Sequence, residues 1–390
     1  MHSRLFAFER DGFVKPLMIK KTPSADLTFT LCTLLLALFG TAMVFSAGYA
    51  YAYARYDDGF YFMKRQVIWL IIGALLMYIA SHIKPCFYKS ATPYLYIITI
   101  FLLVLVLVVG FVGNGAKRWI SIGPLTIQPS EIAKISIILI LAKYFSDYEN
   151  LALERKNKKR IFIYGTALPI TLMLIPIVLV MLQKHLSCII ILGAIGLSMI
   201  IFSGADLRYI YAFGGVGITG ISALAIFTDY TKERITVWRN PEAYRLTGGW
   251  QTLQGLMAIG SGGLFGVGYG KSVMKHCYVS EPANDMIFAI LCEELGLIGA
   301  MTAILLFGVL IFRGFHIAMR ASDVYSRLVA FGISTKMAIQ VLLNIAVVTN
   351  TIPNTGISLP FFSYGGSSLI MLFAEMGIML SISRFSKITK

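Results

Sequence analysis

Charged residues are scarce in this chain. Of its 390 residues, 14% are Asp, Glu, Lys or Arg, 57% are hydrophobic, and the mean hydropathy is +0.76. Soluble globular proteins carry about 25% charged residues and about 45–50% apolar ones. The composition therefore excludes an ordinary soluble enzyme and a disordered protein, and it predicts a polytopic integral membrane protein.

Acidic residues are especially few, because 19 Asp and Glu stand against 34 Lys and Arg, which gives a net charge of +15. In a membrane protein, an excess of basic residues reflects orientation signals and contact with anionic lipids. We therefore expect no nucleic-acid partner.

Cysteines are also few, and their spacing excludes two further classes of protein. None of the five cysteines belongs to a CxxC motif, and Cys32, Cys188 and Cys292 lie inside apolar runs. We expect them to pack as small hydrophobic side chains. The pattern excludes a disulfide-stapled domain and a structural zinc site.

Long apolar runs dominate what is present. A helix needs about 20 mostly apolar residues to cross the hydrocarbon core of a bilayer. The runs predict an all-α protein with about ten transmembrane helices, and the polar residues 183–185 divide the longest run in two. The predicted spans are 27–49, 66–83, 93–112, 128–146, 162–182, 186–203, 210–227, 284–312, 328–350 and 367–384.

The basic residues orient these spans. With a cytoplasmic N-terminus, the inner segments hold nineteen Lys and Arg and the short outer loops hold six. The positive-inside rule then places both termini in the cytoplasm. We expect a cytoplasmic tail over 1–26, a transmembrane domain over 27–384 and a second tail over 385–390. The segment 228–283 then faces outward, as a long structured loop between the seventh and eighth spans.

This outer loop carries six glycines from Gly260 to Gly270. A Walker-type phosphate loop would need a glycine at the position of Phe265 and a strand before it. Neither is present in the sequence, so we expect a tightly turned loop rather than a nucleotide site.

Two acidic residues, Glu281 and Asp285, directly precede the apolar run Met286–Leu291 at the start of the eighth span. An Asp before an apolar run is typical of a helix N-cap, and a helix N-terminus favours the ionised form of a carboxylate. An ionised carboxylate beside a sugar hydroxyl is also a competent general base. The sequence leaves capping and catalysis open, since one residue is able to do both.

Other charged and polar residues lie inside or beside the spans. Intramembrane charges are expensive, so they mark either functional cavities or internal ion pairs. Glu131 and Lys134 share one helical face, and in an outer loop Lys117 and Arg118 are placed to meet lipid phosphates or an anionic head group. We expect Trp119 to be an interfacial anchor and His185 to be a solvated outer residue. The other intramembrane charges are Glu293, Glu294, Lys336 and Glu375.

A polar segment with several glycines, Asn354–Ser368, separates the last two spans. Irregular backbone at membrane depth is tolerated only where protein or a wet cavity covers it. We therefore expect this segment to line a cleft.

Several of these motifs, in this order, resemble the SEDS family of cell-wall polymerases, which comprises FtsW, RodA and SpoVE. The resemblance covers nearly the whole chain after the N-terminal tail, and the loop Trp238–Tyr244 is more similar to FtsW and SpoVE than to RodA. The segments that carry it are Gly115–Trp119, Gln128–Lys134, Gln254–Gly270, Glu281–Gly296 and Asn354–Ser368.

The resemblance implies ten transmembrane helices in the bacterial cytoplasmic membrane and an enzyme that polymerises lipid II on the outer face, for division or sporulation. It assigns the essential aspartate to Asp285. It implies partners as well, namely lipid II, a class B penicillin-binding protein and other membrane proteins of division or sporulation. The substrate-binding candidates are Arg118, Lys134, Glu131, Glu281, Lys117 and Ser363.

The implied reaction is an inverting glycosyl transfer. The 4-hydroxyl of N-acetylglucosamine on one lipid II attacks C1 of N-acetylmuramic acid on the growing strand and displaces undecaprenyl diphosphate. Asp285 takes the proton, and cations stabilise the diphosphate. The first candidates for these cations are Arg118 and Lys134. Further candidates are Lys184, Arg234 and Lys271. A divalent cation, Mg²⁺ or Mn²⁺, is an open option, but no ligand set is legible in the sequence.

One departure from the family lies between the fifth and sixth spans. The family commonly reads Gln-Pro-Asp-Leu-Gly-Thr there, whereas this chain reads Gln183-Lys-His-Leu-Ser-Cys188. His185 thus replaces the aspartate, and no role of that carboxylate, metal binding included, carries over.

Two other functions stay open on the sequence. A lipid II flippase would also use many spans and buried charges, and a scaffold would only recruit a penicillin-binding protein. The outer carboxylate pair favours the polymerase, since a flippase does not need it.

Overall fold

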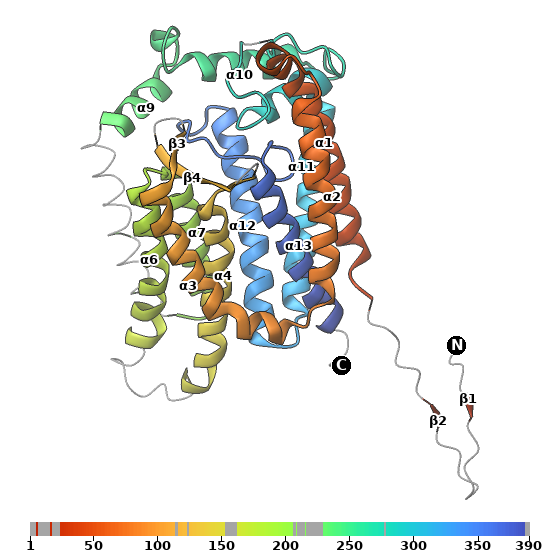
Figure 1. Ribbon diagram of the computed structural model, residues 1–390, viewed down its shortest axis with the longest axis vertical. Coiled ribbons are helices and arrows are strands. Elements are labelled where there is room, and N and C mark those ends of the chain that lie inside the picture. Colours follow the sequence, from red (N-terminus) through yellow and green to blue (C-terminus); the bar gives the residue numbers. More distant parts are fainter. Residues whose placement is uncertain are drawn as a thin grey trace, which may run out of the picture.

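The computed structural model describes residues 24–386 except 114–115, 123–124, 153–161, 206–207, 209–214, 216–228 and 277, together with two short paired strands, β1 (Leu5–Phe6) and β2 (Pro16–Leu17). Within that part, long helices form one bundle (Figure 1). They are α1 (Leu27–Tyr56), α2 (Tyr61–His82), α3 (Pro85–Val109), α4 (Pro129–Ala152), α6 (Leu168–Leu182), α7 (Leu186–Phe202), α11 (Ile287–Met319), α12 (Val324–Val348) and α13 (Gly366–Ser386). A π-helical turn, η1 (Ile163–Ala167), leads into α6.

These nine helices match nine of the ten predicted spans. The tenth, 210–227, lies outside the described residues except for Gly215. Seven of the described helices are long and apolar enough to cross a membrane, namely α1, α2, α3, the continuous η1–α6 helix, α11, α12 and α13. The apolar α7 is shorter. The chain is therefore a nearly all-helical, multi-pass membrane protein.

One small sheet interrupts the helical fold. The strands β3 (Phe111–Gly113), β4 (Ala116–Ile122) and β5 (Leu125–Ile127) pair antiparallel in the order β3-β4-β5 between α3 and α4. The predicted all-α class is confirmed, and this small sheet is an addition that the apolar runs did not predict. Val, Ile and Trp in this segment suit strands, and backbone that is not helical needs pairing partners at a membrane surface.

Glycines let the central helices approach closely. A Cβ at Gly73 of α2 would lie 2.4 Å from the Phe373 ring of α13, and a Cβ at Gly377 would lie 2.6 Å from Ala80. Small residues at such contacts bring helices together in membranes, where van der Waals packing drives association. The α2–α13 pair thereby forms one wall of the bundle.

The helix α11 is broken near its start, because Gly296 has non-helical angles (φ 64°, ψ −163°). The glycine run packs on this break. The amides of Val267 and Gly268 donate to the carbonyls of Glu293 and Glu294, each at 3.0 Å. The prediction of a tightly turned loop is confirmed, and its glycines accommodate the backbone of α11 rather than a nucleotide.

The segment from Asp229 to Asp285 is structured, as expected. It holds α9 (Asp229–Arg239), a 3₁₀ turn, η2 (Glu242–Tyr244), and α10 (Trp250–Ser261). Figure 1 shows α9 and α10 at the end of the bundle opposite the start of α1 and the end of α13. Which side of the membrane this end faces stays a prediction.

Candidate active site

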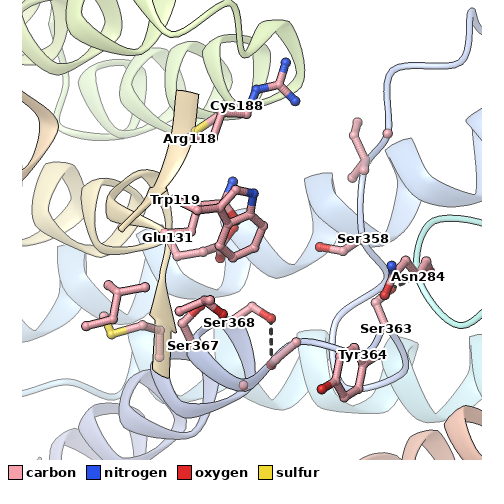
Figure 2. Close-up of a pocket in the computed structure, with 18 of the residues that line it drawn as sticks. Arg118, Trp119, Glu131, Cys188, Asn284, Ser358, Ser363, Tyr364, Ser367 and Ser368 are labelled. Carbon is pink, nitrogen blue, oxygen red and sulfur yellow. Dashed lines mark hydrogen bonds between the residues drawn. The ribbon is translucent and has the colours of Figure 1, made fainter. Parts of the chain in front are cut away.

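A cavity of about 630 Å³ lies among the β3–β5 sheet, the start of α4, the α6–α7 turn, the segment before α11 and the segment before α13. The prediction that the Asn354–Ser368 segment lines a cleft is confirmed. Residues of three other family-like motifs, Gly115–Trp119, Gln128–Lys134 and Glu281–Gly296, line the same cavity. The predicted site residues that line it are Arg118, Glu131, Lys134, Glu281, Asp285 and Ser363. Figure 2 shows Arg118, Trp119 and Glu131 apart from Asn284, Ser363 and Tyr364 across this space.

The remaining cationic candidates lie elsewhere. Lys117 is exposed and is not among the residues that line the cavity. Lys271 is likewise exposed and outside it. Lys184 contributes its backbone carbonyl, which accepts a hydrogen bond from Arg118, and Arg234 donates to the carbonyl of Asn354 beside the cavity.

Asp285 is held by its backbone rather than by a helix cap. The helix α11 begins at Ile287 with Met286 as its N-cap and no side-chain cap, so the N-cap interpretation of Asp285 was wrong. The amide of Asn344 donates to the Asp285 carbonyl at 3.1 Å. The carboxylate is therefore left to point into the cavity that it lines.

The segment before α13 fixes the position of this carboxylate. Ser363 Oγ donates to the carbonyl of Asn284 at 2.8 Å, and the amide of Tyr364 donates to the carbonyl of Ala283 at 2.8 Å. Gly356 has φ 69°, and a Cβ there would lie 3.0 Å from Asp285 Oδ2. A glycine is thus needed where this segment passes the carboxylate.

Burial, followed by the neighbouring charge of Glu281, raises the pKa of Asp285, and the charges of Arg234 and Arg118 lower it; the net result is a pKa of about 6. The sequence suggested that a helix N-terminus would favour the ionised form of this carboxyl and so lower its pKa. The helix α11 starts two residues later, at Ile287. Desolvation of the ionised form raises the pKa instead. An aspartate with this pKa is ionised at neutral pH and is a stronger base than a solvated aspartate.

The opposite side of the cavity is cationic. Arg118, on β4, is oriented by its bond to the Lys184 carbonyl, and its Nε is buried with no hydrogen-bond partner among the described residues. Lys134 Nζ lies 2.8 Å from Glu131 and 3.4 Å from Gln340 Oε1. Trp119 lines the cavity next to Arg118. Its interpretation as an interfacial anchor stays a prediction.

His185 also lines the cavity and is half-buried, so the expectation of a solvated outer residue was wrong. Its Nδ1 lies 3.4 Å from Ser130 Oγ. Burial lowers the pKa of His185 to about 3, and the charge of Arg118 lowers it as well. The residue that replaces the family aspartate is therefore a neutral imidazole at the cationic side of the cavity.

Several lining residues were not predicted from the sequence, chiefly Arg65 and Trp69 on α2, Gln340 on α12 and Tyr364 before α13. Arg65 and Trp69 are four residues apart, so they project from one face of α2. That spacing was visible in the sequence, but only the packing of α2 on α13 shows that this face meets the cavity.

The other intramembrane charges form internal pairs outside the main lining. Glu294 binds Lys275 at 2.8 Å, and Glu293 accepts the amide of Val273 at 2.9 Å, so both hold the glycine run on α11. Lys336 and Glu375 are buried and lie 2.5 Å apart, which links α12 to α13. These residues fix packing beneath and beside the cavity.

The described residues contain no group of three or more His, Cys, Asp and Glu placed to hold a metal ion. In the cavity, Glu131 is already paired with Lys134, and His185 faces Arg118. The side chains present therefore do not fit a metal held by the protein alone.

The chain is similar to known proteins over nearly its full length. The FtsW/RodA/SpoVE family model, described as "Cell cycle protein", matches residues 26–388. Stage V sporulation protein E of Bacillus subtilis (strain 168) is 40% identical over 372 residues, which are 95% of this chain and 100% of that protein. A probable peptidoglycan glycosyltransferase FtsW of Geobacter sulfurreducens (strain DL-1 / KN400) is 35% identical, with 94% and 97% of the two chains covered.

Two solved structures are also similar to this chain. The rod shape determining protein RodA of Thermus thermophilus superposes with a TM-score of 0.68 at 27% identity, covering 92% of this chain and 97% of that one. A structure described as the structural coordination of polymerization and crosslinking by a peptidoglycan synthase complex gives a TM-score of 0.77 at 26% identity, with 93% and 98% covered.

Proposed function

This chain belongs to the FtsW/RodA/SpoVE family of membrane-embedded peptidoglycan glycosyltransferases, and we propose that it polymerises lipid II into glycan strands with release of undecaprenyl diphosphate. One observation carries the proposal. A single cavity places a carboxylate with a raised pKa, Asp285, within the electrostatic range of a fixed arginine, Arg118. A glycosyl transfer from a diphosphate needs both a base and a cation.

In this proposal Asp285 is the general base. It accepts the proton of the acceptor 4-hydroxyl while the new bond forms between that oxygen and C1 of the donor sugar. The bond from C1 to the diphosphate oxygen breaks on the opposite face, so the configuration inverts. Glu281 keeps the base strong by its negative charge, and its own carboxylate is held by the amide of Asn284.

The leaving diphosphate belongs at the cationic side. Arg118 offers a buried Nε that lacks a protein partner in the described part of the chain. Lys134 is held in place by Glu131 and Gln340, so its charge is positioned before substrate binds. Preorganised donors of this kind stabilise developing negative charge without reorganisation. No step is routed through a metal ion.

The apolar residues of the cavity suit a lipid-linked substrate. Ile132, Ile370 and Met371 line it beside the polar groups, and they come from α4 and α13. We propose that the isoprenoid chains leave the cavity along this side. We further propose a class B penicillin-binding protein as partner, since the structurally similar synthase complex coordinates polymerization and crosslinking.

The proposal is tested with the purified full-length chain and its partner on labelled lipid II. Asp285→Asn keeps the side-chain size and removes the base, so we expect glycan ladders on gels to disappear while folding and insertion persist. Arg118→Ala is expected to slow turnover at limiting lipid II. Glu242→Gln, an exposed acidic residue of η2 in the same loop, is the matched control and retains activity.

Two outcomes would contradict this proposal. Near-normal ladders from Asp285→Asn would remove that residue from catalysis. Transbilayer movement of lipid II without ladders from the unaltered chain would favour the flippase.

A further inference from the structure

A cluster of aromatic and arginine side chains lies at the turn between α1 and α2, and all its members except Tyr364 lie outside the motifs that carry the proposed function. We call it the aromatic platform and define it as Tyr51, Tyr56, Tyr61, Phe62 and Tyr364, with Arg55 and Arg65. The turn lies at the same end of the bundle as α10 (Figure 1).

The platform is built around one parallel stack. The rings of Tyr56 and Tyr61 lie 3.9 Å apart with an interplanar angle of 8°, and the guanidinium of Arg65 lies 4.4 Å from the centre of the Tyr61 ring. One face of Tyr61 is occupied by Tyr56, so Arg65 covers the other. Tyr56 ends the stack and is 44% exposed.

The turn beneath the stack is rigid. Asp57 ends α1 with φ 53°, and Asp58 accepts the amide of Phe60 at 2.9 Å. A Cβ at Gly59 would lie 2.4 Å from the ring of Tyr49, so a larger residue there would displace that ring. The rings are therefore held in place before any ligand arrives.

The platform is continuous with the candidate active site. Phe62 packs on Tyr364 with ring centres 4.7 Å apart, and Tyr364 and Arg65 both line the cavity. Arg65 also lies within electrostatic range of the Tyr364 hydroxyl. Arg55 donates a hydrogen bond to Tyr51 at 2.7 Å and lies within electrostatic range of Glu281, which also lines the cavity.

We propose that the aromatic platform is a saccharide subsite, which binds N-acetylated sugar units of the glycan strand as the strand extends out of the cavity. This inference rests on the proposed function. The C–H face of a pyranose ring stacks on an exposed aromatic ring, and arginine and tyrosine donors bind its hydroxyl and acetamido oxygens.

The composition favours a sugar over the lipid bilayer or a partner helix. An interfacial aromatic belt needs amphipathic rings at the headgroup level, but it needs neither a preformed stack nor continuity with a cavity. A partner helix in a membrane packs on small residues and apolar surface. The platform instead combines a rigid stack with two arginines beside a catalytic cavity.

The test measures sugar binding without catalysis. A soluble N-acetylglucosamine tetramer is titrated into the full-length protein in detergent, and its dissociation constant is measured. Tyr56→Ala is expected to weaken binding about threefold to tenfold, the effect of losing one aromatic contact. Tyr56→Phe keeps the ring and is expected to bind like the unaltered chain. The control is Tyr53→Ala, one turn earlier on α1 and 60% exposed.

A second readout follows the product. With lipid II, Tyr56→Ala is expected to shorten the glycan strands, since a strand that is held less firmly leaves earlier. Tetramer affinity equal to that of the unaltered chain in Tyr56→Ala would overturn the inference. So would loss of penicillin-binding-protein capture with tetramer affinity unchanged, because the platform would then be a protein contact. If the unaltered chain binds the tetramer but makes no strands, the proposed function fails instead.

Discussion

At the scale of single residues, Asp285 combines two demands that oppose each other. A base in a cavity that excludes water is stronger, because burial disfavours its charged form. It must also be ionised at the working pH, and the charges of Arg118 and Arg234 oppose the effect of burial. The balance sets the pKa of Asp285 at about 6, below neutrality but well above that of a solvated aspartate.

This balance predicts a pH dependence. The ionised form of Asp285 is the active one, so the polymerisation rate at saturating lipid II should rise as the pH passes about 6 and then level off. Glu281→Gln removes a negative charge that raises this pKa, so the midpoint of its rise should move to lower pH. Each rate profile is normalised to its own plateau.

Glu242→Gln serves as the control for this measurement, because Glu242 is exposed on η2 and does not line the cavity. Its midpoint should stay at that of the unaltered chain. A midpoint for Glu281→Gln that is unchanged or higher would mean that Glu281 does not act on the base.

The sequence predicted the charged members of the site better than their neighbours. Asp285, Arg118 and Lys134 were found through motifs, and one cavity contains them all. Lys117 was grouped with Arg118, but β4 is an extended strand that sends adjacent side chains to opposite faces. His185 was misplaced because its burial depends on the packing of the α6–α7 turn against β4, which no local pattern records.

At the scale of elements, the glycine run and the start of α11 form one unit. The break at Gly296 leaves backbone groups of α11 without helical partners, and the glycine run bonds to them from residue 263 to residue 268. Lys275 joins the unit, since its Nζ lies 2.8 Å from Glu294 and 3.1 Å from Ser46 Oγ of α1. This unit connects the loop to α1 and α11.

Replacing Lys275 by Met should destabilise the protein strongly. Glu294 is fully buried. Leaving a buried charge without its partner lowers the free energy of unfolding by about 3–5 kcal/mol. The double variant Lys275→Met with Glu294→Gln removes both charges, so it should recover much of this loss. The unfolding temperatures of the single and the double variant in detergent measure the loss and its recovery.

The surface pair Lys64–Asp58 provides the comparison. Lys64 Nζ and Asp58 Oδ2 lie 2.9 Å apart, but both side chains are exposed. Exposed ion pairs contribute about 0–1 kcal/mol to the free energy of unfolding. Lys64→Met should therefore unfold near the temperature of the unaltered chain. Equal effects of Lys64→Met and Lys275→Met would show that the buried pair is not what holds the loop.

The element scale also marks a limit of prediction from sequence. The glycine composition predicted a tight turn, which is confirmed, but the charges of Glu293 and Glu294 could only be described as functional or structural. Their partners, Ser272 to Lys275, come about 20 residues earlier in the chain. A pairing at that separation depends on the fold of the whole loop.

At the scale of the whole molecule, the bundle has two unlike ends. Apolar runs alone predicted nine of the helices that the structure describes, because the length needed to cross a bilayer is fixed. They did not predict that the β3–β5 sheet, the residues before α11 and those before α13 meet at one end to form the cavity. That meeting depends on the order in which helices pack, and the α2–α13 contact joins residues about 300 positions apart.

The two ends should face opposite sides of the membrane, with α9, η2 and α10 outside. Labelling with a membrane-impermeant maleimide on intact protoplasts tests this orientation. Native Cys86, exposed at the start of α3, should stay unlabelled until the cells are permeabilised. Glu242→Cys, in η2, should label at once. The variant carries Cys277→Ser, so that a second cysteine of the same loop does not contribute.

The remaining cysteines do not confuse the reading, because Cys32, Cys188 and Cys292 are buried. Labelling of Cys86 in intact cells together with protection of Glu242→Cys would reverse the orientation. The cavity would then open toward the cytoplasm, which is incompatible with polymerisation of the cell wall outside the cell. The expected pattern instead places Asp285, the cationic side and the aromatic platform at the outer surface, where the growing strand must leave the protein.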